Sequence, residues 1–581
     1  MKFSNQIAVW LKELGYTHYF YVGGGNIMHL TESLSQYLKG IPVVHEVAAG
    51  ICAEYFNEIS NKNTRALALV TAGPGLTNIV TSLSGAWLES RELLVIGGQV
   101  KVSDLSNEDL RSRGIQEIKG VDLVKTITKI AKQINAPIGP EEFINIVSES
   151  WKPRKGPVFL EIPIDIQACT VSEKNIKKIF NYKLNLTNRK DLEYTFKKYN
   201  ASKKPILLIG GGVDYYTMKK CHDLIVKKKI PIMTTYNGAD RFDPNINSYF
   251  GRPNTWGQRS SNIIIQEADL IIAIGTRLGL QQTGFNWQEF GRNAHIIQID
   301  IDEYELKKGH PNINKALCVD ANDFIVNFIK LNLNTKKRWL NYCNKIRNVI
   351  PRIEKINKTG REYISPYEFI VKLENLTKDN DLIIPCSSGS AFTLTMQLYK
   401  HKHGQRIITN KSLAAMGYGL SGSIGACIGA GNKKRTILIE GDGGFSQNLQ
   451  EIGTAEINKL NIKIFIFNDQ GHASIRMTQQ NYFEGKYLGC DHKSGLRLPD
   501  WIQLFKAWNI NVTKINKGFE NDQKFLTSFN SKSLCAFIVQ IDPEQTYYPK
   551  ISSKIIEKGD MISNPIDRMS PEINYTEGIN Y

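Results

Sequence analysis

Two short glycine-containing loops carry the strongest chemical signal in the chain. The first, Gly441-Asp442-Gly443-Gly444, follows an apolar run at 436–439, and the second, Asn468-Asp469-Gln470-Gly471, follows an apolar run at 462–467. A strand, a helix and a second strand fit this stretch, so both loops are expected at one edge of one sheet, where Asp442 and Asp469 can meet one ion. Mg²⁺ prefers oxygen ligands and commonly bridges carboxylates to phosphates. Glycines permit close backbone approach, and a helix start offers N–H groups to a diphosphate.

A glutamate in the N-terminal third is the second candidate. Glu46 lies at a predicted strand-to-helix junction within 41–56, and small residues follow it. A partly buried carboxylate that is hydrogen-bonded to a heterocycle nitrogen can hold a shared proton. An isolated glutamate at a helix start is also typical of a cap or a surface charge, so the residue alone leaves both interpretations open.

The elements that must position these residues repeat one theme three times. Short Ile/Val/Leu runs end in glycine and precede helix-like segments, which is typical of parallel sheets covered on both faces. The fold class is therefore α/β, with three doubly wound parallel-sheet domains. We expect domains at 1–175, 190–345 and 365–545, a tail at 546–581, and polar connections at 181–204 and 332–362. The predicted strands are 19–22, 66–70, 93–96, 205–209, 270–274, 296–299, 382–384, 436–439, 462–467 and 536–541.

Bulk composition narrows the function classes. The 581 residues exceed what one hydrophobic core usually serves, so several domains are expected. The net charge of +17 is dispersed among Asn and Ile without a basic, aromatic-interleaved stripe, which argues against nucleic acid. No run approaches a membrane span and the start lacks a signal-peptide centre, so a cytoplasmic protein without membrane partners is expected. The nine scattered cysteines predict no disulfide framework.

The segment around Asp442 resembles the thiamine-diphosphate motif, which is GDG, a spacer and a closing Asn pair. Here the second Asn is replaced by Asp469, which keeps an oxygen ligand and adds negative charge. The resemblance implies thiamine diphosphate and Mg²⁺ as cofactors, with Asp442, Asp469 and the carbonyl of Gly471 as metal ligands. It also implies that Gly443 and Gly444 approach the diphosphate.

Similarity to the acetolactate synthase family then extends along nearly all of the chain. In that family a glutamate at the position of Glu46 protonates the aminopyrimidine ring of the coenzyme and so starts removal of the thiazolium proton. YVGGGNIMHL matches the early Gly-Gly loop and places Gly24 near the substrate, VTAGPGLTN matches a cofactor loop, and Gln99 falls in the TGQV stretch. The resemblance makes 1–175 the pyrimidine-binding domain and 365–545 the diphosphate- and metal-binding domain. The implied coenzyme contacts are Pro74, Asn78, Gly389, Ser390 and Met416, the last beneath the bent cofactor.

The middle domain carries a weaker, dinucleotide-like signal. Gly210-Gly211-Gly212 follows a predicted strand without full GxGxxG spacing. The acetolactate synthase family binds FAD here, so a central FAD-binding domain with a structural flavin is the expectation. A middle domain without cofactor, as in related decarboxylases, is the alternative. The implied flavin contacts are Gly211, Gly212, Thr235, Arg277, Asp300, Ile301 and Asp320.

Two departures from that family concern the acceptor. Thr478 stands where the family has a substrate-selecting tryptophan, and Ile115-Gln116-Glu117 stands for Phe-Gln-Glu. Both changes remove an aromatic ring and should open the acceptor pocket. His472 and Arg476 add polar groups on the same loop, and the arginine could meet a sugar or phosphate. The pattern is similar to a subgroup from branched-sugar biosynthesis of the yersiniose type.

The predicted activity is thiamine-diphosphate-dependent decarboxylation of pyruvate and transfer of the two-carbon unit to a nucleotide-linked keto-deoxysugar. The predicted catalytic residues are Glu46, Gly24, Gln116 and His472. Alternatives are an acetolactate synthase using a second 2-oxo acid, a non-ligating 2-oxo acid decarboxylase, a catalytically idle subunit and a flavin oxidoreductase. The decarboxylase group usually has an adjacent His-His pair, which this sequence lacks. A homodimer or homotetramer is expected, because in this family the thiamine sites form between the first domain of one chain and the third of another.

Overall fold

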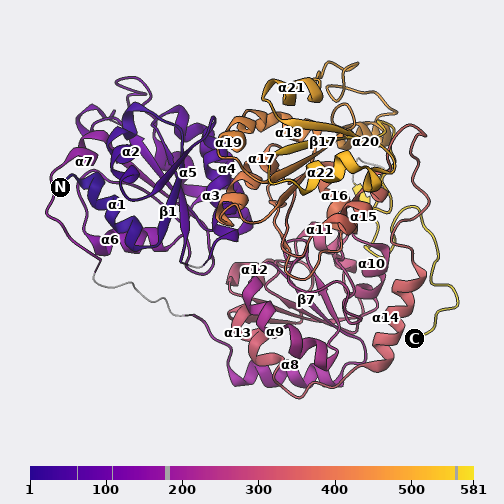
Figure 1. Ribbon diagram of the computed structural model, residues 1–581. Coiled ribbons are helices and arrows are strands. Elements are labelled where there is room, and N and C mark those ends of the chain that lie inside the picture. Colours follow the sequence, from indigo (N-terminus) through magenta and orange to yellow (C-terminus); the bar gives the residue numbers. More distant parts are fainter. Residues whose placement is uncertain (62, 108, 177–183, 557–560) are drawn as a thin grey trace. The chain divides into compact units, whose positions relative to one another are not determined.

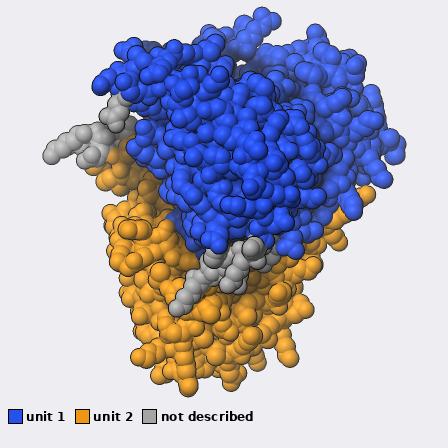
Figure 2. All heavy atoms as spheres, turned by 90° about the vertical axis from the view of Figure 1, so that its left-hand side faces the viewer, with its two compact units in different colours: residues 1–182, 381–392, 408–540 blue, residues 183–380, 393–407, 541–581 orange. Residues whose placement is uncertain are grey.

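The computed structural model describes all residues except 62, 108, 177–183 and 557–560 (Figure 1). The chain divides into two compact units, which are coloured in Figure 2. Unit 1 comprises 1–182, 381–392 and 408–540, and unit 2 comprises 183–380, 393–407 and 541–581. Every helix within the described residues is too short or too polar to cross a membrane.

The first sheet of unit 1 is wholly parallel, in the order β2-β1-β3-β4-β6-β5. Its central strands are mostly apolar because both faces of the sheet are covered, and alternate residues of β3 enter two separate cores. The strands are β1 Tyr16–Tyr21, β2 Lys39–Pro42, β3 Arg65–Val70, β4 Leu93–Gln99, β5 Ile130–Gln133 and β6 Pro157–Pro163. The helices are α1 Phe3–Glu13, η1 Gly25–Ile27, α2 Met28–Ser35, α3 Glu46–Ile59, α4 Pro74–Glu89, η2 Val102–Asp104, α5 Gly120–Val124, η3 Lys125–Ile127, α6 Pro140–Ser148 and α7 Ile164–Ala168.

The second sheet of unit 1 repeats this design with strands in the order β12-β14-β15-β17-β16, again parallel. The strands are β12 Leu382–Pro385, β14 Thr436–Gly441, β15 Ile462–Asn468, β16 Asn511–Ile515 and β17 Cys535–Gln540. The helices are α17 Tyr418–Gly429, α18 Asp442–Phe445, η5 Ser446–Glu451, α19 Ile452–Ile457, α20 Ala473–Tyr482, α21 Trp501–Ala507, η6 Phe519–Asn521 and α22 Gln523–Asn530. Helix α16 spans Gly389–Leu398, and its first turn follows β12.

Unit 2 holds the central parallel sheet, in the order β11-β10-β9-β7-β8. The strands are β7 Pro205–Ile209, β8 Ile232–Thr234, β9 Leu270–Ile274, β10 His295–Asp300 and β11 Lys315–Cys318, with β13 Arg406–Ile407 and the antiparallel pair β18 Ser553–Ile555 and β19 Met561–Ser563. The helices are α8 Arg189–Ala201, α9 Tyr215–Lys228, α10 Arg259–Gln266, α11 Leu280–Thr283, η4 Trp287–Glu289, α12 Glu303–Lys307, α13 Ala321–Phe328, α14 Lys337–Val349 and α15 Pro366–Leu376. These three sheets confirm the predicted doubly wound α/β class.

The two predicted connections are not plain linkers. Helix α8 lies within the first and helix α14 within the second, although both are rich in Lys and Asn. In α14 the residues Trp339, Tyr342, Cys343 and Ile346 are buried in the core of unit 2. Their spacing is that of one helix face. The many Lys, Arg and Asn residues between them made this apolar face hard to recognise in the sequence.

Helices α3 and α17 pack against each other at very short range, and Figure 1 shows them side by side. Glycines on α17 make this possible. A Cβ on Gly425 would collide with the backbone carbonyl of Cys52, and one on Gly422 would stand 2.7 Å from the ring of Tyr55. The first and third predicted domains are therefore joined within one chain and one unit.

A buried ion pair secures the same contact. Glu54 of α3 is fully buried and accepts from Arg91 at 2.7 Å, from Asn410 at 3.1 Å and from Tyr418 of α17 at 3.3 Å. Arg91 also donates to the carbonyl of Thr409 at 2.6 Å. Burial raises the pKa of Glu54 to about 7, although Arg91 opposes the rise. The carboxylate thus connects elements from both sheets of unit 1.

Replacing Gly425 by Val should destabilise unit 1 by about 2 kcal/mol or more, because the added side chain meets backbone that cannot move aside. The measurement is the urea midpoint followed by far-UV circular dichroism. Gly114→Val is the matched control, since no atom lies within 4 Å of a Cβ there. Equal midpoints for the two variants would contradict the proposed close packing.

Candidate functional site

Asp442 and Asp469 lie at the carboxyl ends of the neighbouring strands β14 and β15. Both are buried, with exposed fractions of 0% and 2%. Asp442 accepts from the N–H of Gly443 at 2.7 Å and from the N–H of Gly471 at 3.2 Å. The second bond draws the two predicted metal loops together through Asp442 itself.

Arg476, which was expected to meet a sugar or phosphate, lies beside Asp469. Its Nη2 donates to Asp469 Oδ1 at 2.9 Å and to the Asp469 carbonyl at 2.6 Å, and the residue is only 4% exposed. The expectation that Arg476 meets an acceptor is therefore wrong, because its guanidinium is engaged with the extra carboxylate at position 469. One buried cation faces two buried carboxylates.

The electrostatics of the pair favour a further cation. Burial, and after it the charge of Asp469, raises the pKa of Asp442 well above its usual range. Burial also raises the pKa of Asp469 to about 6, although Arg476 opposes the rise. The Gly471 carbonyl oxygen stands 3.3 Å from where a Cβ on Gly443 would lie. Two carboxylates and a carbonyl form an all-oxygen donor set that fits a hard divalent ion such as Mg²⁺.

A third loop reaches the same edge of this sheet. Strand β12 pairs with β14, and the chain turns after it into Ser388-Gly389-Ser390, where α16 begins. Gly389 has φ +77°, and no atom lies within 4 Å of a Cβ placed on it. Gly389 thus supplies open backbone at a helix start, which suits a diphosphate, whereas Gly443 lies against the ring of His472.

Met416 projects from a loop with an unusual backbone. Ala414 and Gly417 on either side have φ of +56° and +84°, and the Gly417 carbonyl accepts from the side chain of Asn448 at 2.8 Å. The Met416 side chain is 36% exposed. A large apolar side chain on a fixed loop is thus available to contact a ligand.

Glu46 begins α3 and is 8% exposed. Asn78 of α4 donates to its Oε2 at 3.0 Å. The backbone just ahead of it is fixed by Glu451, whose Oε1 accepts from the N–H groups of Val44 and His45 at 3.1 and 3.0 Å. Glu451 ends η5, and η5 follows α18, whose first residue is Asp442. The turn before Glu46 is therefore bound to the segment that follows the predicted metal loop.

Three further loops of the first domain meet one another. Gly24 packs against the side chain of Thr71, which no larger residue at position 24 would allow. Gly73, with φ +63°, precedes Pro74 at the start of α4, and a Cβ there would stand 2.9 Å from Cα of Gln116. Gln116 is exposed and has φ +63°. The structure therefore brings Gly24, Pro74 and Gln116 into one neighbourhood.

Gln99 is hydrogen-bonded to the backbone two residues after Gln116. It is 1% exposed, and its Nε2 donates to the Ile118 carbonyl at 3.0 Å and to Glu161 at 3.2 Å. Burial raises the pKa of Glu161 to about 7. Glu161 and Glu451 support the candidate site but were not predicted, because their hydrogen-bond partners lie far away along the chain.

The predicted acceptor residues separate into two groups. The ring of His472 lies against Gly443, so this side chain belongs to the metal and diphosphate loops. Burial, and after it the charge of Arg476, lowers the pKa of His472. Thr478 is exposed and donates to the Ser474 carbonyl at 3.0 Å, and Ile115 is 84% exposed.

The predicted flavin residues follow the carboxyl ends of the central strands in unit 2. Gly212 donates to the Gly275 carbonyl at 2.9 Å, and a Cβ on it would stand 2.9 Å from Gly275 Cα. Close packing of two loops therefore accounts for this glycine. Asp320 caps α13 by accepting from the N–H of Asp323 at 2.8 Å, and Asp300 accepts from the N–H of Asp302 at 3.0 Å. The remaining predicted positions in this set are Gly211, Thr235, Arg277 and Ile301.

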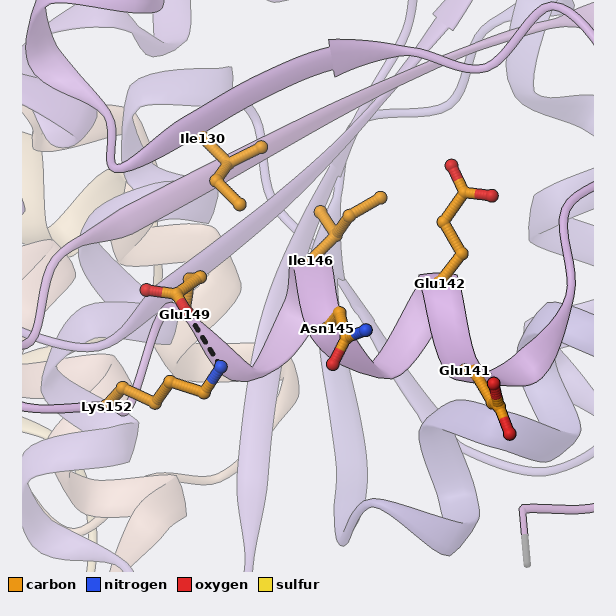
Figure 3. Close-up of a pocket in the computed structure, with 7 residues that line it drawn as sticks. All are labelled: Ile130, Glu141, Glu142, Asn145, Ile146, Glu149 and Lys152. Carbon is orange, nitrogen blue, oxygen red and sulfur yellow. Dashed lines mark hydrogen bonds and ion pairs between the residues drawn. The ribbon is translucent and has the colours of Figure 1, made fainter. Parts of the chain in front are cut away.

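A surface pocket beside α6 does not coincide with these residues. Figure 3 shows Glu149 directed toward Lys152, an ion pair of 2.7 Å, with Glu141 and Glu142 further along the helix. None of the residues lining it was predicted to do chemistry, and the pocket lacks the glycine loops of the strand ends.

Comparison with known proteins decides the family. Three models of thiamine pyrophosphate enzymes match in order: the N-terminal TPP binding domain at 1–123, the central domain at 194–328 and the C-terminal TPP binding domain at 387–539. The chain is a thiamine pyrophosphate-dependent enzyme. Thiamine pyrophosphate is another name for thiamine diphosphate, so the matches agree with the coenzyme expected from the sequence.

The similarity of this thiamine enzyme to curated relatives extends along most of the chain. The large subunit of acetolactate synthase isozyme 1 from Escherichia coli is 26% identical over 550 residues, covering 91% of this chain and 92% of that protein. The large subunit from Lactococcus lactis is 27% identical over 539 residues, covering 90% of each chain. The large subunit from Cyanidium caldarium is 28% identical over 519 residues, covering 85% of each.

In this thiamine enzyme, Arg476→Met should lower the free energy of unfolding of metal-free unit 1 by about 3 kcal/mol, because Asp469 is left buried without its cation. The urea midpoint in the presence of a chelator measures the change. Adding Asp469→Asn to the variant should restore most of the loss, since the uncompensated charge is then removed. An unchanged midpoint for Arg476→Met would show that the ion pair does not form.

Proposed function

We propose that this thiamine enzyme decarboxylates pyruvate and transfers the resulting two-carbon unit to a carbonyl acceptor. The observation that carries the proposal is Glu46, a buried carboxylate whose preceding turn is bound by Glu451 of η5, the element that follows α18 and its first residue Asp442. A catalytically idle subunit has no physical need of both the carboxylate and the metal loops. The acetolactate synthase relatives support the same reaction class.

Each group of residues has its own proposed role: metal binding, diphosphate binding or proton sharing. Asp442, Asp469 and the Gly471 carbonyl would hold Mg²⁺, and the glycine loops after β12 and β14 would hold the diphosphate. When bound, the coenzyme supplies an electron sink for the carbon that loses CO₂. Asn78 donates to Oε2 of Glu46, which leaves Oε1 to share a proton with a ring nitrogen of the coenzyme. Met416 would support the coenzyme from below.

Glu46→Gln should reduce the rate of CO₂ release from pyruvate by about a hundredfold or more, because the amide cannot supply the proton while it still accepts from Asn78. Circular dichroism and coenzyme affinity should remain close to those of the unchanged enzyme. Glu58→Gln, at the other end of α3, is the matched control and should keep full activity. Full activity in Glu46→Gln would remove the carboxylate from the mechanism.

The acceptor proposed here is larger than a second pyruvate, as a nucleotide-linked keto-deoxysugar would be. The support is the loss of ring surface at Thr478 and Ile115, both of which are exposed. Acetolactate formation from two 2-oxo acids is the second candidate, and the names of the relatives favour it. Release of free aldehyde is a third outcome of the same assay.

Product analysis separates these candidates. The enzyme is incubated with pyruvate alone, with pyruvate and 2-oxobutyrate, and with pyruvate and a nucleotide-linked keto-deoxysugar. The products are identified by mass spectrometry. The proposal predicts a sugar product heavier by C₂H₄O, an acetyl group on the former keto carbon and a hydrogen on its oxygen, and little acetolactate. Acetolactate as the main product under all conditions would establish the second candidate instead.

A structural flavin in unit 2 is a further part of the proposal. The order in which the chain adds strands to the central sheet reverses between β7 and β9. Ligands of such sheets bind at this topological switch point. The loops that carry Gly211, Thr235 and Arg277 follow these and the adjacent strand. A homodimer is also proposed, in which Glu46 of one chain would meet the metal and diphosphate loops of the other, as the resemblance to acetolactate synthases implies.

A further inference from the structure

A second group of metal-ligating side chains lies in unit 2. His222 comes from α9, Asp243 from the loop after β8, and His403 from the segment ahead of β13. One ligand atom from each lies within 4.8 Å of the other two. Three segments that are distant in the sequence therefore present two imidazoles and a carboxylate to one point.

The two ring nitrogens of His222 are in different environments. Its Nδ1 lies 3.0 Å from Oδ1 of Asp223, and this contact places the ring proton on Nδ1 and the lone pair on Nε2. Nε2 is buried, and no described residue hydrogen-bonds to it. A buried ring nitrogen without a partner is costly, so a bound group at this point would satisfy it.

The other two ligands complete the arrangement. The ring of His403 lies 5.2 Å from that of His222, centroid to centroid, and the residue is exposed. Asp243 is half-buried and is held by the N–H of Asn245, which donates to its Oδ1 at 2.9 Å. An ion at this point would therefore have protein ligands on one side and water on the other.

We propose that His222, Asp243 and His403 bind a transition-metal ion of the zinc class. Two imidazoles and a carboxylate with a fourth position open to water are a common zinc ligand set. A carboxylate that orients a metal-binding histidine, as Asp223 orients His222, is the usual supporting group. Nitrogen ligands suit zinc and not magnesium, so this site and the Asp442–Asp469 site differ in the ion they select.

The ion would join three parts of unit 2. It would tie the segment ahead of β13 to helix α9 and to the loop after β8, none of which belongs to the proposed thiamine diphosphate loops. The role is stabilising: zinc that binds only the folded state raises the unfolding midpoint.

The test uses the full-length enzyme with thiamine diphosphate and millimolar Mg²⁺, so that the magnesium site is filled. Zinc is titrated in competition with a chromophoric chelator, and the unfolding midpoint is measured with and without zinc. The expected result is one tightly held zinc per chain that Mg²⁺ does not displace, together with a higher midpoint. His403→Gln should lose the zinc, and Asp223→Asn should weaken its binding by about tenfold or more.

His310→Gln is the matched control. His310 is another histidine of unit 2 whose Nε2 is buried without a partner among the described residues, and it lies outside the cluster. This variant should bind zinc as the unchanged enzyme does. The proposal is overturned if the unchanged enzyme retains no zinc, or if His403→Gln and His310→Gln retain it equally. Because His403 is exposed, its replacement should leave the fold intact, which circular dichroism verifies.

Discussion

The close approach of α3 and α17 is the constraint on which unit 1 depends. Glycines at 422 and 425 let the two backbones nearly touch, and the buried Glu54–Arg91 pair fixes the contact. This packing sets where α3 begins, and Glu46 stands at its first turn. The Glu451 carboxylate then binds that turn to the chain that leaves the metal loop. The Glu46 carboxylate, which is proposed to hold the shared proton, thus stands on the helix that this packing fixes.

Charge balance is the second constraint on the site. A carboxylate at position 469 places two buried negative groups at adjoining strand ends, and Arg476 supplies one compensating positive charge from α20. Two carboxylates and one guanidinium leave one negative charge uncompensated, which favours the binding of a further cation. A neutral side chain at 469 would leave Arg476 without its partner, so the two residues must be considered together.

The sequence predicted strands such as β7 and β9, because strands buried on both faces appear as continuous apolar runs. It did not predict β6 Pro157–Pro163, although that strand is equally buried. It also predicted the loops of Asp442, Asp469 and Gly389, since ligand loops follow such strands. It did not predict α8 or α14, whose apolar faces are hidden among Lys and Asn. Arg476 was given the wrong partner, because nothing in a sequence shows which way a buried guanidinium points. Contacts such as Glu451 with Val44 join residues too distant in the chain to be inferred.

The central claim is that a divalent ion held by Asp442 and Asp469 fixes the diphosphate of the coenzyme. The most direct measurement is calorimetric titration of thiamine diphosphate into metal-free enzyme, with and without Mg²⁺. We expect saturable binding of one coenzyme per chain when Mg²⁺ is present and at least a hundredfold weaker binding with the chelator. Equal affinity under both conditions, or no binding with Mg²⁺, would contradict the account.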